Sequence, residues 1–176
     1  VQDGDRVGGV VLGATRAYEL PPGRGQLAVS RLLRQIVAAS AGPAAPEALP
    51  PGALSAPLAR LVKPGALVFV LSDFRDLDPG TMADLARVAA HSQLRALQFY
   101  DAFEQALPAL QAPLRVTARG AALDLDLGDA ALRATYARQH AARQARLAEF
   151  CTGQRIPLTT IATTDDPLLR LQPAAP

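Results

Sequence analysis

The chain of 176 residues is long enough for one domain with a hydrophobic core, and its 49% hydrophobic residues indicate a globular protein. A net charge of +2 and only 5% aromatic residues argue against nucleic-acid binding, because no basic stripe is interleaved with aromatic side chains. The single cysteine, Cys151, excludes an internal disulfide, and no apolar run approaches the roughly 20 residues that span a bilayer.

Strands are expected to alternate with helices in the first half of the chain. Valines among small residues predict a buried strand over 5–13. A short second strand is expected to end at Pro21–Gly25. Apolar residues at helical spacing predict the helices. The uncharged run that begins at Ala66 predicts the clearest buried strand. The expected elements are strands over 5–13 and 66–73, and helices over 25–42, 53–62 and 78–91, the last capped by Asp78.

The second half continues the alternation and adds a hairpin. Strict alternation on both sides of Arg119-Gly120 predicts an inserted β-hairpin near Leu114–Leu127. The other expected elements are a strand over 94–101, a connecting turn over 102–110, a helix over 130–152 capped by Asp129, and a last strand and short helix within 156–172. Such alternation favours parallel pairing in an α/β fold.

Polar residues follow three of the predicted strands: Asp73, Asp101 and Thr164-Asp165. Ligands of parallel α/β sheets bind beyond the carboxyl ends of the strands, but helix caps lie there too. The carboxylates at 73, 76 and 78 are therefore read either as loop and cap residues, as part of a metal site, or as a general acid–base pair.

Five phrases, taken in order along the chain, resemble a bacterial family known as domain of unknown function 58. Each phrase alone is weakly specific, but the ordered set covers nearly the whole chain. The phrases are GDRVGGVVLG (Gly4–Gly13), LPPGRGQ (Leu20–Gln26), LVFVLSDFRD (Leu67–Asp76), YDAFEQALP (Tyr100–Pro108) and TTDDPLLRL (Thr163–Leu171).

The resemblance implies a three-layer α/β fold with a mostly parallel, doubly wound sheet, similar to a von Willebrand factor A domain. Residues 1–176 would form a single such domain that lacks its first strand, expected upstream of Val1. That strand lies centrally in the family's fold, so its absence would leave two strand edges unpaired. Either a longer native chain or a neighbouring molecule would fill the gap, which makes a homo-oligomer through these edges an option.

In von Willebrand A domains a divalent cation, usually Mg²⁺, binds to oxygen ligands from three loops. Asp73 matches one of these ligands. The Asp-x-Ser-x-Ser ligand segment would lie upstream of this chain, and the expected threonine is absent from LPPGALSAP, where Gly52 or Ala53 takes its place. The resemblance therefore implies an incomplete site at Asp73, with Mg²⁺ as cofactor only if the upstream segment exists.

The family is typically encoded beside MoxR-type AAA+ ATPases, so the resemblance implies a non-enzymatic protein-interaction module that acts with such an ATPase in chaperone-like or complex-assembly work. The alternatives are a metal-dependent hydrolase that uses the carboxylates around Asp73, and a small-molecule binding domain. A cytoplasmic location is expected, with an upstream membrane anchor left open. The candidate partner-binding residues are Asp73, Asp76, Asp101, Arg138, Arg143 and Arg146, the arginines forming one basic face of the helix over 130–152.

Overall fold

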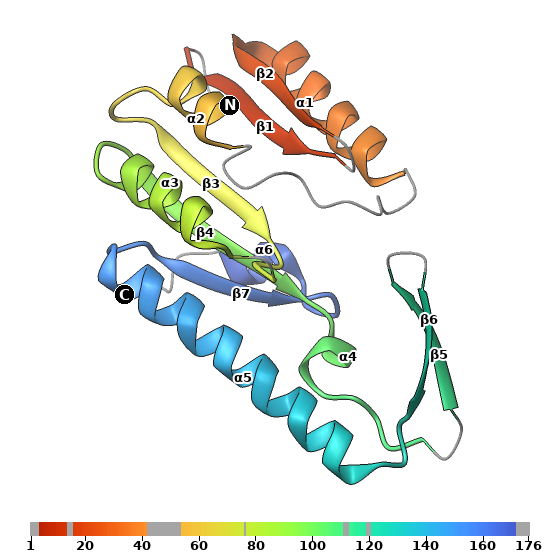
Figure 1. Cartoon of the computed structure of the whole chain (residues 1–176). Coiled ribbons are helices and arrows are strands. Elements are labelled where there is room, and N and C mark those ends of the chain that lie inside the picture. The colour runs from red at the N-terminus through yellow and green to blue at the C-terminus, as the bar shows by residue number, and fades with distance from the viewer. Residues whose placement is uncertain are drawn as a thin grey trace. The chain divides into compact units, whose positions relative to one another are not determined.

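The structure is a computed structural model, which describes residues 4–13, 16–41, 54–75, 77–110, 113–118 and 121–171. The chain divides into two compact units. Unit 1 comprises Val1–Ala66 and Asp78–His91, and unit 2 comprises Leu67–Leu77 and Ser92–Pro176. Figure 1 labels the elements of both units.

Unit 1 is built on an antiparallel hairpin covered by one helix. Its elements are β1 (Arg6–Leu12), β2 (Ala17–Arg24), α1 (Gly25–Ser40), α2 (Ser55–Leu61) and α3 (Pro79–Ala89). Two glycines of β1 allow the packing. A Cβ on Gly8 would lie 2.6 Å from the carbonyl oxygen of Leu20, and one on Gly9 would lie 3.2 Å from Leu32 of α1. The pairing register shifts between Val7 and Gly9, as in a β-bulge.

The second strand is longer than the sequence suggests. The expectation that Pro21–Gly25 ends it is wrong, because β2 continues through both prolines to Arg24 and pairs there with Arg6. Proline is tolerated in a strand whose outer edge has no partner, since its missing N–H is then not needed for a ladder. Among the described residues β2 pairs only with β1.

Helix α1 buries little apolar surface, whereas α3 buries Leu85 and Val88. No residue of α1 is fully buried, and Leu27, Leu33 and Val37 stay more than half exposed. The expected cap of α3 is confirmed: the Asp78 side chain accepts hydrogen bonds from the backbone N–H groups of Gly80 and Thr81. Pro57 lies in the first turn of α2, where proline is tolerated.

Unit 2 contains a parallel sheet, a hairpin and a long helix. Its elements are β3 (Leu67–Ser72), β4 (Gln93–Tyr100), α4 (Ala102–Gln105), β5 (Pro113–Ala118), β6 (Ala121–Asp126), α5 (Ala130–Gly153), β7 (Leu158–Ala162) and α6 (Pro167–Leu171). The sheet order is β3-β4-β7 with both pairs parallel. The central strand β4 buries Leu94, Ala96, Leu97 and Gln98, as expected of a parallel strand with a neighbour on each side.

The expectation of a fully buried strand after Ala66 is wrong for one face of β3. Leu67, Phe69 and Leu71 are 55%, 48% and 61% exposed, and the residues between them are half-buried. Among the described residues β3 pairs with β4 alone and β1 with β2 alone. Each of these two strands therefore has one edge without a partner strand among the described residues.

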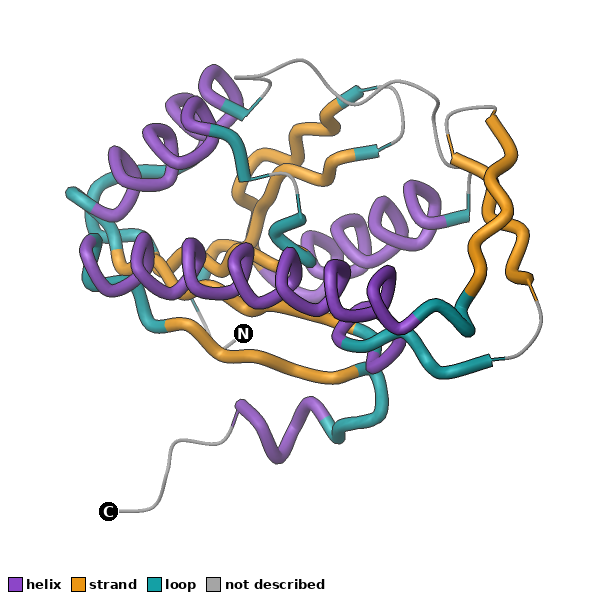
Figure 2. The backbone as a smooth tube through the Cα atoms, turned by 60° about the horizontal axis from the view of Figure 1, so that its bottom comes forward, coloured by secondary structure: helices purple, strands orange, loops and turns teal. Residues whose placement is uncertain are grey.

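The hydrophobic core of unit 2 lies between the parallel sheet and α5, which runs alongside the sheet in Figures 1 and 2. Leu147 and Cys151 of α5 are buried, as is Ile161 of β7. The predicted hairpin is confirmed as β5–β6, and it stands apart from the parallel sheet. Asp129 caps α5 as predicted, accepting a hydrogen bond of 2.8 Å from the N–H of Ala131.

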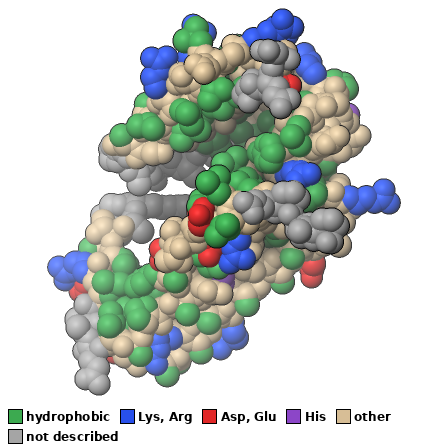
Figure 3. All heavy atoms as spheres, turned by 180° about the vertical axis from the view of Figure 1, so that it is seen from behind, with side chains coloured by type: hydrophobic (Ala, Val, Ile, Leu, Met, Phe, Trp, Pro, Cys, Tyr) green, Lys and Arg blue, Asp and Glu red, His purple; other side chains and the backbone are tan. Residues whose placement is uncertain are grey.

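The α/β class is confirmed, but the single doubly wound sheet is not what the structure shows. Among the described residues three strands are parallel and the other four form two antiparallel pairs, because β1 and β2 follow each other closely in the sequence and the insertion folds on itself. Figure 3 shows exposed hydrophobic side chains among charged ones on the visible face. In the described part of the chain, no helix is both long enough and apolar enough to cross a membrane.

Candidate functional site at the carboxyl end of the parallel sheet

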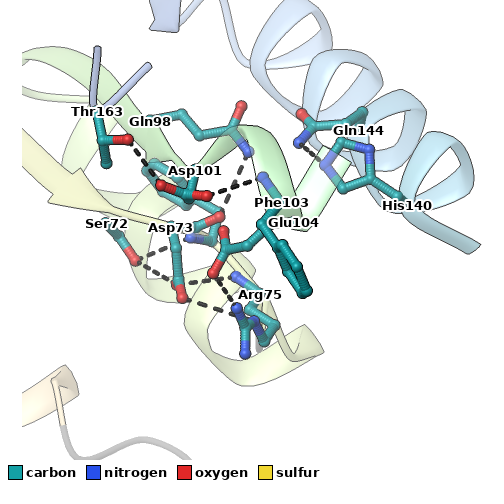
Figure 4. Close-up of polar contacts among 11 residues, drawn as sticks. Ser72, Asp73, Arg75, Gln98, Asp101, Phe103, Glu104, His140, Gln144 and Thr163 are labelled. Carbon is teal, nitrogen blue, oxygen red and sulfur yellow. Dashed lines mark hydrogen bonds and ion pairs between the residues drawn. The ribbon is translucent and has the colours of Figure 1, made fainter. Parts of the chain in front are cut away.

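The end of β3 turns sharply at Asp73. Its carboxylate oxygen Oδ1 accepts a hydrogen bond of 3.1 Å from the backbone N–H of Arg75, and the Ser72 hydroxyl accepts one of 3.0 Å from the N–H of Phe74. These bonds hold Phe74 at φ 53°, a left-handed conformation that is uncommon for a bulky residue. The turn keeps the Asp73 carboxylate at the end of the strand (Figure 4).

Arg75 bridges two carboxylates of this region. Its guanidinium lies 3.7 Å from the Asp73 carboxylate and donates a hydrogen bond to Glu104, which lies on α4 beyond β4 (Figure 4). All three side chains are at least one-third exposed, so solvent screens these ion pairs. The bridge nevertheless places a positive charge between two acids that would otherwise repel each other.

Asp101 connects the ends of β4 and β7. One carboxylate oxygen accepts the N–H of Phe103 at 2.8 Å and thereby caps α4, and the other accepts the Thr163 hydroxyl at 2.8 Å. The N–H of Thr163 also donates to the carbonyl of Tyr100 at 2.9 Å. The Phe103 N–H, followed by the Thr163 hydroxyl, lowers the pKa of the Asp101 carboxyl because both bonds favour its charged form.

A small cavity lies behind these residues, against α5. Its volume is about 30 Å³, room for roughly one or two water molecules, and its lining includes Asp73, Arg75, Gln98, Glu104, His140 and Arg143. Gln98 is 3% exposed and donates to the Asp73 carbonyl at 3.3 Å, but its Oε1 accepts no hydrogen bond from the described residues. That buried oxygen is an acceptor for a donor group that enters the cavity.

The carboxyl-end site, meaning Asp73, Arg75, Gln98, Asp101 and Glu104, unites some of the predicted residues and not others. Asp73 and Asp101 lie there as predicted, and Arg143 lines the cavity. Arg138 is exposed on α5 and donates to Thr135 at 3.0 Å, and Arg146 is exposed on the same helix. Asp76 lies outside the described residues, so its role stays a prediction.

The acidic pair before the last helix has two different roles. Asp166 caps α6 by accepting the N–H of Leu168 at 2.9 Å. Asp165 instead accepts the N–H of Ala162 at 2.9 Å and pairs with Arg170. Asp166, directly before Pro167, is therefore the residue that caps α6, because the Asp165 carboxylate is engaged by β7.

Sequence reasoning missed the contributions of Arg75, Gln98 and α5. The helix over 130–152 looked like a solvated basic face, yet Tyr136, His140 and Gln144 point inward from it and line the cavity. His140 and Gln144 contact each other through their Nε2 atoms at 3.3 Å. Their spacing of four residues, continued by Leu147 and Cys151, was a helical stripe that could have identified the inward face.

The described residues fit a divalent cation poorly. They contain no group of three or more His, Cys, Asp or Glu side chains placed to hold a metal ion. Two of the site's acids, Asp73 and Glu104, already have the Arg75 guanidinium against them. A hard cation such as Mg²⁺ needs several oxygen ligands and would have to displace that positive charge.

Comparison with solved structures finds similarity in fold alone. The chain matches the conserved hypothetical protein BatB from Bacteroides thetaiotaomicron with a TM-score of 0.52 and 14% identity, over 96% of this chain and 75% of that chain. An aerotolerance-related membrane protein from Bacteroides fragilis matches with a TM-score of 0.43 and 17% identity, over 86% and 81% of the two chains.

A search of curated proteins gave no match. The sequence model of the family described as "Protein of unknown function DUF58" matches residues 1–146. The phrases that carry the resemblance lie largely within that match. The chain therefore belongs to the DUF58 family.

Proposed function

We propose that the chain is a non-enzymatic protein-interaction module that binds a partner protein through the carboxyl-end site. The observation that carries the proposal is the bridge of Arg75 between Asp73 and Glu104. It makes an exposed patch of alternating charge, which suits recognition of another charged surface. The von Willebrand A-like architecture inferred from the family resemblance agrees with this use of the strand ends.

The chemistry of the described residues supports binding over hydrolysis. Both oxygens of Asp101 already accept hydrogen bonds, so that carboxylate is engaged as a structural acceptor. His140 contacts Gln144, and His91 contacts the carbonyl of Arg87, so among the described residues neither histidine contacts a hydroxyl or thiol nucleophile. Burial raises the pKa of the Cys151 thiol, which disfavours the thiolate form that acts as a nucleophile.

A MoxR-type AAA+ ATPase is the proposed partner, on the strength of the family resemblance. Arg143 at the cavity and Arg138 further along α5 extend the charged surface beyond the two acids. A partner that presents both acidic and basic side chains would complement this surface, and a donor side chain of the partner would satisfy the buried Gln98 Oε1.

The test is the binding of the purified chain to a purified MoxR-type AAA+ ATPase, measured by biolayer interferometry. The double variant Asp73→Asn/Glu104→Gln should weaken binding about tenfold, because it leaves Arg75 without its acids and reverses the charge balance of the patch. Asp124→Asn, which removes an exposed carboxylate from the hairpin, is the matched control and should leave binding unchanged. Equal binding by the wild-type protein and the double variant would exclude this site as the contact.

A further inference from the structure

Unit 1 contains a second cavity, unrelated to the carboxyl-end site. Its volume is about 420 Å³, within the range of roughly 300–1,000 Å³ that ligand pockets occupy. It lies between β2 and the first two turns of α1. Its walls are mostly apolar and include Val7, Leu20, Pro21, Leu27 and Ala28.

Arginines dominate the charge of this cavity. Arg24 and Arg31 line it, and Arg6 is the cross-strand neighbour of Arg24, so the two strand arginines share one face of the hairpin. None of the three side chains has an ion-pair or hydrogen-bond partner among the described residues. Like charges placed directly opposite each other in a sheet are destabilising, so a bound anion would relieve a repulsion built into the hairpin.

No acid of the lining cancels this positive charge. Glu19 also lines the cavity, but its carboxylate accepts two hydrogen bonds from Arg60 of α2. The hydrogen bonds from Arg60 hold the pKa of Glu19 below its usual value, so this acid stays ionised and paired. The amino end of α1 adds to the positive field, because no side chain caps it and its first turn holds no acidic residue.

The spacing of the arginines selects the kind of anion. Arg24 precedes α1 and Arg31 lies seven residues later, which separates them by about 10 Å along the helix axis. A single carboxylate or phosphate cannot contact both. In a peptide with the extended polyproline II conformation, which has three residues per turn, two acidic residues three positions apart lie on the same side and are separated by about 9 Å, close to the spacing of the arginines. Apolar side chains of such a peptide would contact the Leu20 and Leu27 walls.

We propose that this cavity, with Arg24 and Arg31 in its lining and Arg6 opposite Arg24, is a docking groove for an extended acidic, leucine-rich peptide segment of a partner protein. The peptide lies in this arginine groove and does not extend the sheet along the free edge of β2. Pro21 and Pro22 lack the N–H groups that pairing along that edge would use.

The experiment is calorimetric titration of the whole chain with a capped pentapeptide, Glu-Leu-Leu-Glu-Leu, at low salt. We expect saturable binding that weakens as salt is added, and at least about tenfold weaker binding of the matching Gln-Leu-Leu-Gln-Leu peptide. Arg24→Gln/Arg31→Gln should lower the affinity for the acidic peptide to that of the neutral one.

Two controls make the assignment specific. Arg34→Gln removes one charge from the same helix outside the groove and should leave the affinity for the acidic peptide unchanged, with circular dichroism confirming that each variant is folded. Octanoate, a single carboxylate on an apolar chain, should compete at least about tenfold more weakly than the acidic peptide. Unchanged peptide binding by the double variant, or octanoate competing as well as the peptide, would overturn the proposal.

Discussion

The carboxyl-end site of unit 2 and the arginine groove of unit 1 differ in whether their arginines are paired with acids. In unit 2, Arg75 lies against Asp73 and Glu104, so the positive charge at the carboxyl-end site is balanced within the chain. In unit 1, Arg6 and Arg24 face each other across the hairpin and Arg31 lies nearby on α1, with no acid paired to any of them among the described residues. The first arrangement offers a surface of alternating charge, and the second offers a field that only an external anion can balance.

The scaffolds below these two regions also differ. The strand ends of unit 2 rest on buried residues of β4, β7 and α5, whereas α1 beside the arginine groove has no fully buried residue. Precise geometry at the carboxyl-end site thus depends on a packed interior. The arginine groove is attached to a lightly buried hairpin and can adapt to a ligand more readily.

The largest effect should come from removing the packing under the carboxyl-end site. Ile161 of β7 is 1% exposed, and Ile161→Ala should lower the free energy of unfolding by about 3 kcal/mol, since it leaves a cavity in the core. Leu33→Ala on the exposed side of α1 should change it by less than about 0.5 kcal/mol. Urea unfolding followed by circular dichroism measures the stability of both variants. Equal losses in the free energy of unfolding would contradict the difference in packing between the two regions.

A smaller effect is expected at the start of α5, the helix that carries His140 and Arg143 to the cavity. Asp129→Ala removes the side-chain acceptor for the Ala131 N–H and should cost about 1 kcal/mol of stability. Asp129→Asn keeps an acceptor at the cap and should cost much less. If the asparagine and alanine variants unfold at the same urea concentration, the capping bond has no role in stability.

Reversing one charge of the hairpin tests whether Arg6 and Arg24 repel each other. Arg24→Glu places an acid opposite Arg6 and replaces a repulsion with an attraction, so it should raise the stability by about 0.5 kcal/mol. Arg95→Glu reverses an exposed charge of β4 and controls for the change in net charge. A destabilised Arg24→Glu protein, with Arg95→Glu unaffected, would show that the strand arginines do not repel each other.

The smallest effect concerns pH. Because the folded-state pKa of Asp101 is lowered, its bonds to Phe103 and Thr163 contribute stability above the carboxyl's usual pKa, and that contribution is lost as pH falls through the lower folded-state value. Asp101→Asn should therefore flatten the acid side of the stability profile without altering it near neutrality. If stability falls with the same slope at acid pH in both proteins, the Asp101 carboxylate does not contribute to the pH dependence of stability.

Much of the secondary structure could be predicted from local patterns, because helix caps and strand alternation are local. Asp78 and Asp129 cap their helices as their positions before helical stretches suggest. The burial of β3 could not be predicted, since the hydrophobicity of Leu67, Phe69 and Leu71 does not reveal whether another strand lies beside them. Pairing is decided by distant segments of the chain.

The candidate site also has features that could be predicted from the sequence and features that could not. Asp73 and Asp101 could be placed at strand ends from sequence, because parallel strands bring those ends to one edge. Their partners could not, since Arg75 reaches Glu104 across 29 positions and Asp101 reaches Thr163 across 62. The bridging role of Arg75 emerges only when the strand ends are brought together.

Calorimetric titration of the chain with Mg²⁺ tests most directly the claim that Arg75 takes the place of a cation at the carboxyl-end site. The account predicts no saturable heat of binding up to about 1 mM free Mg²⁺, because Asp73 and Glu104 are already paired with the guanidinium. Saturable binding in that range, abolished by Asp73→Asn, would contradict the account and favour a metal-dependent site.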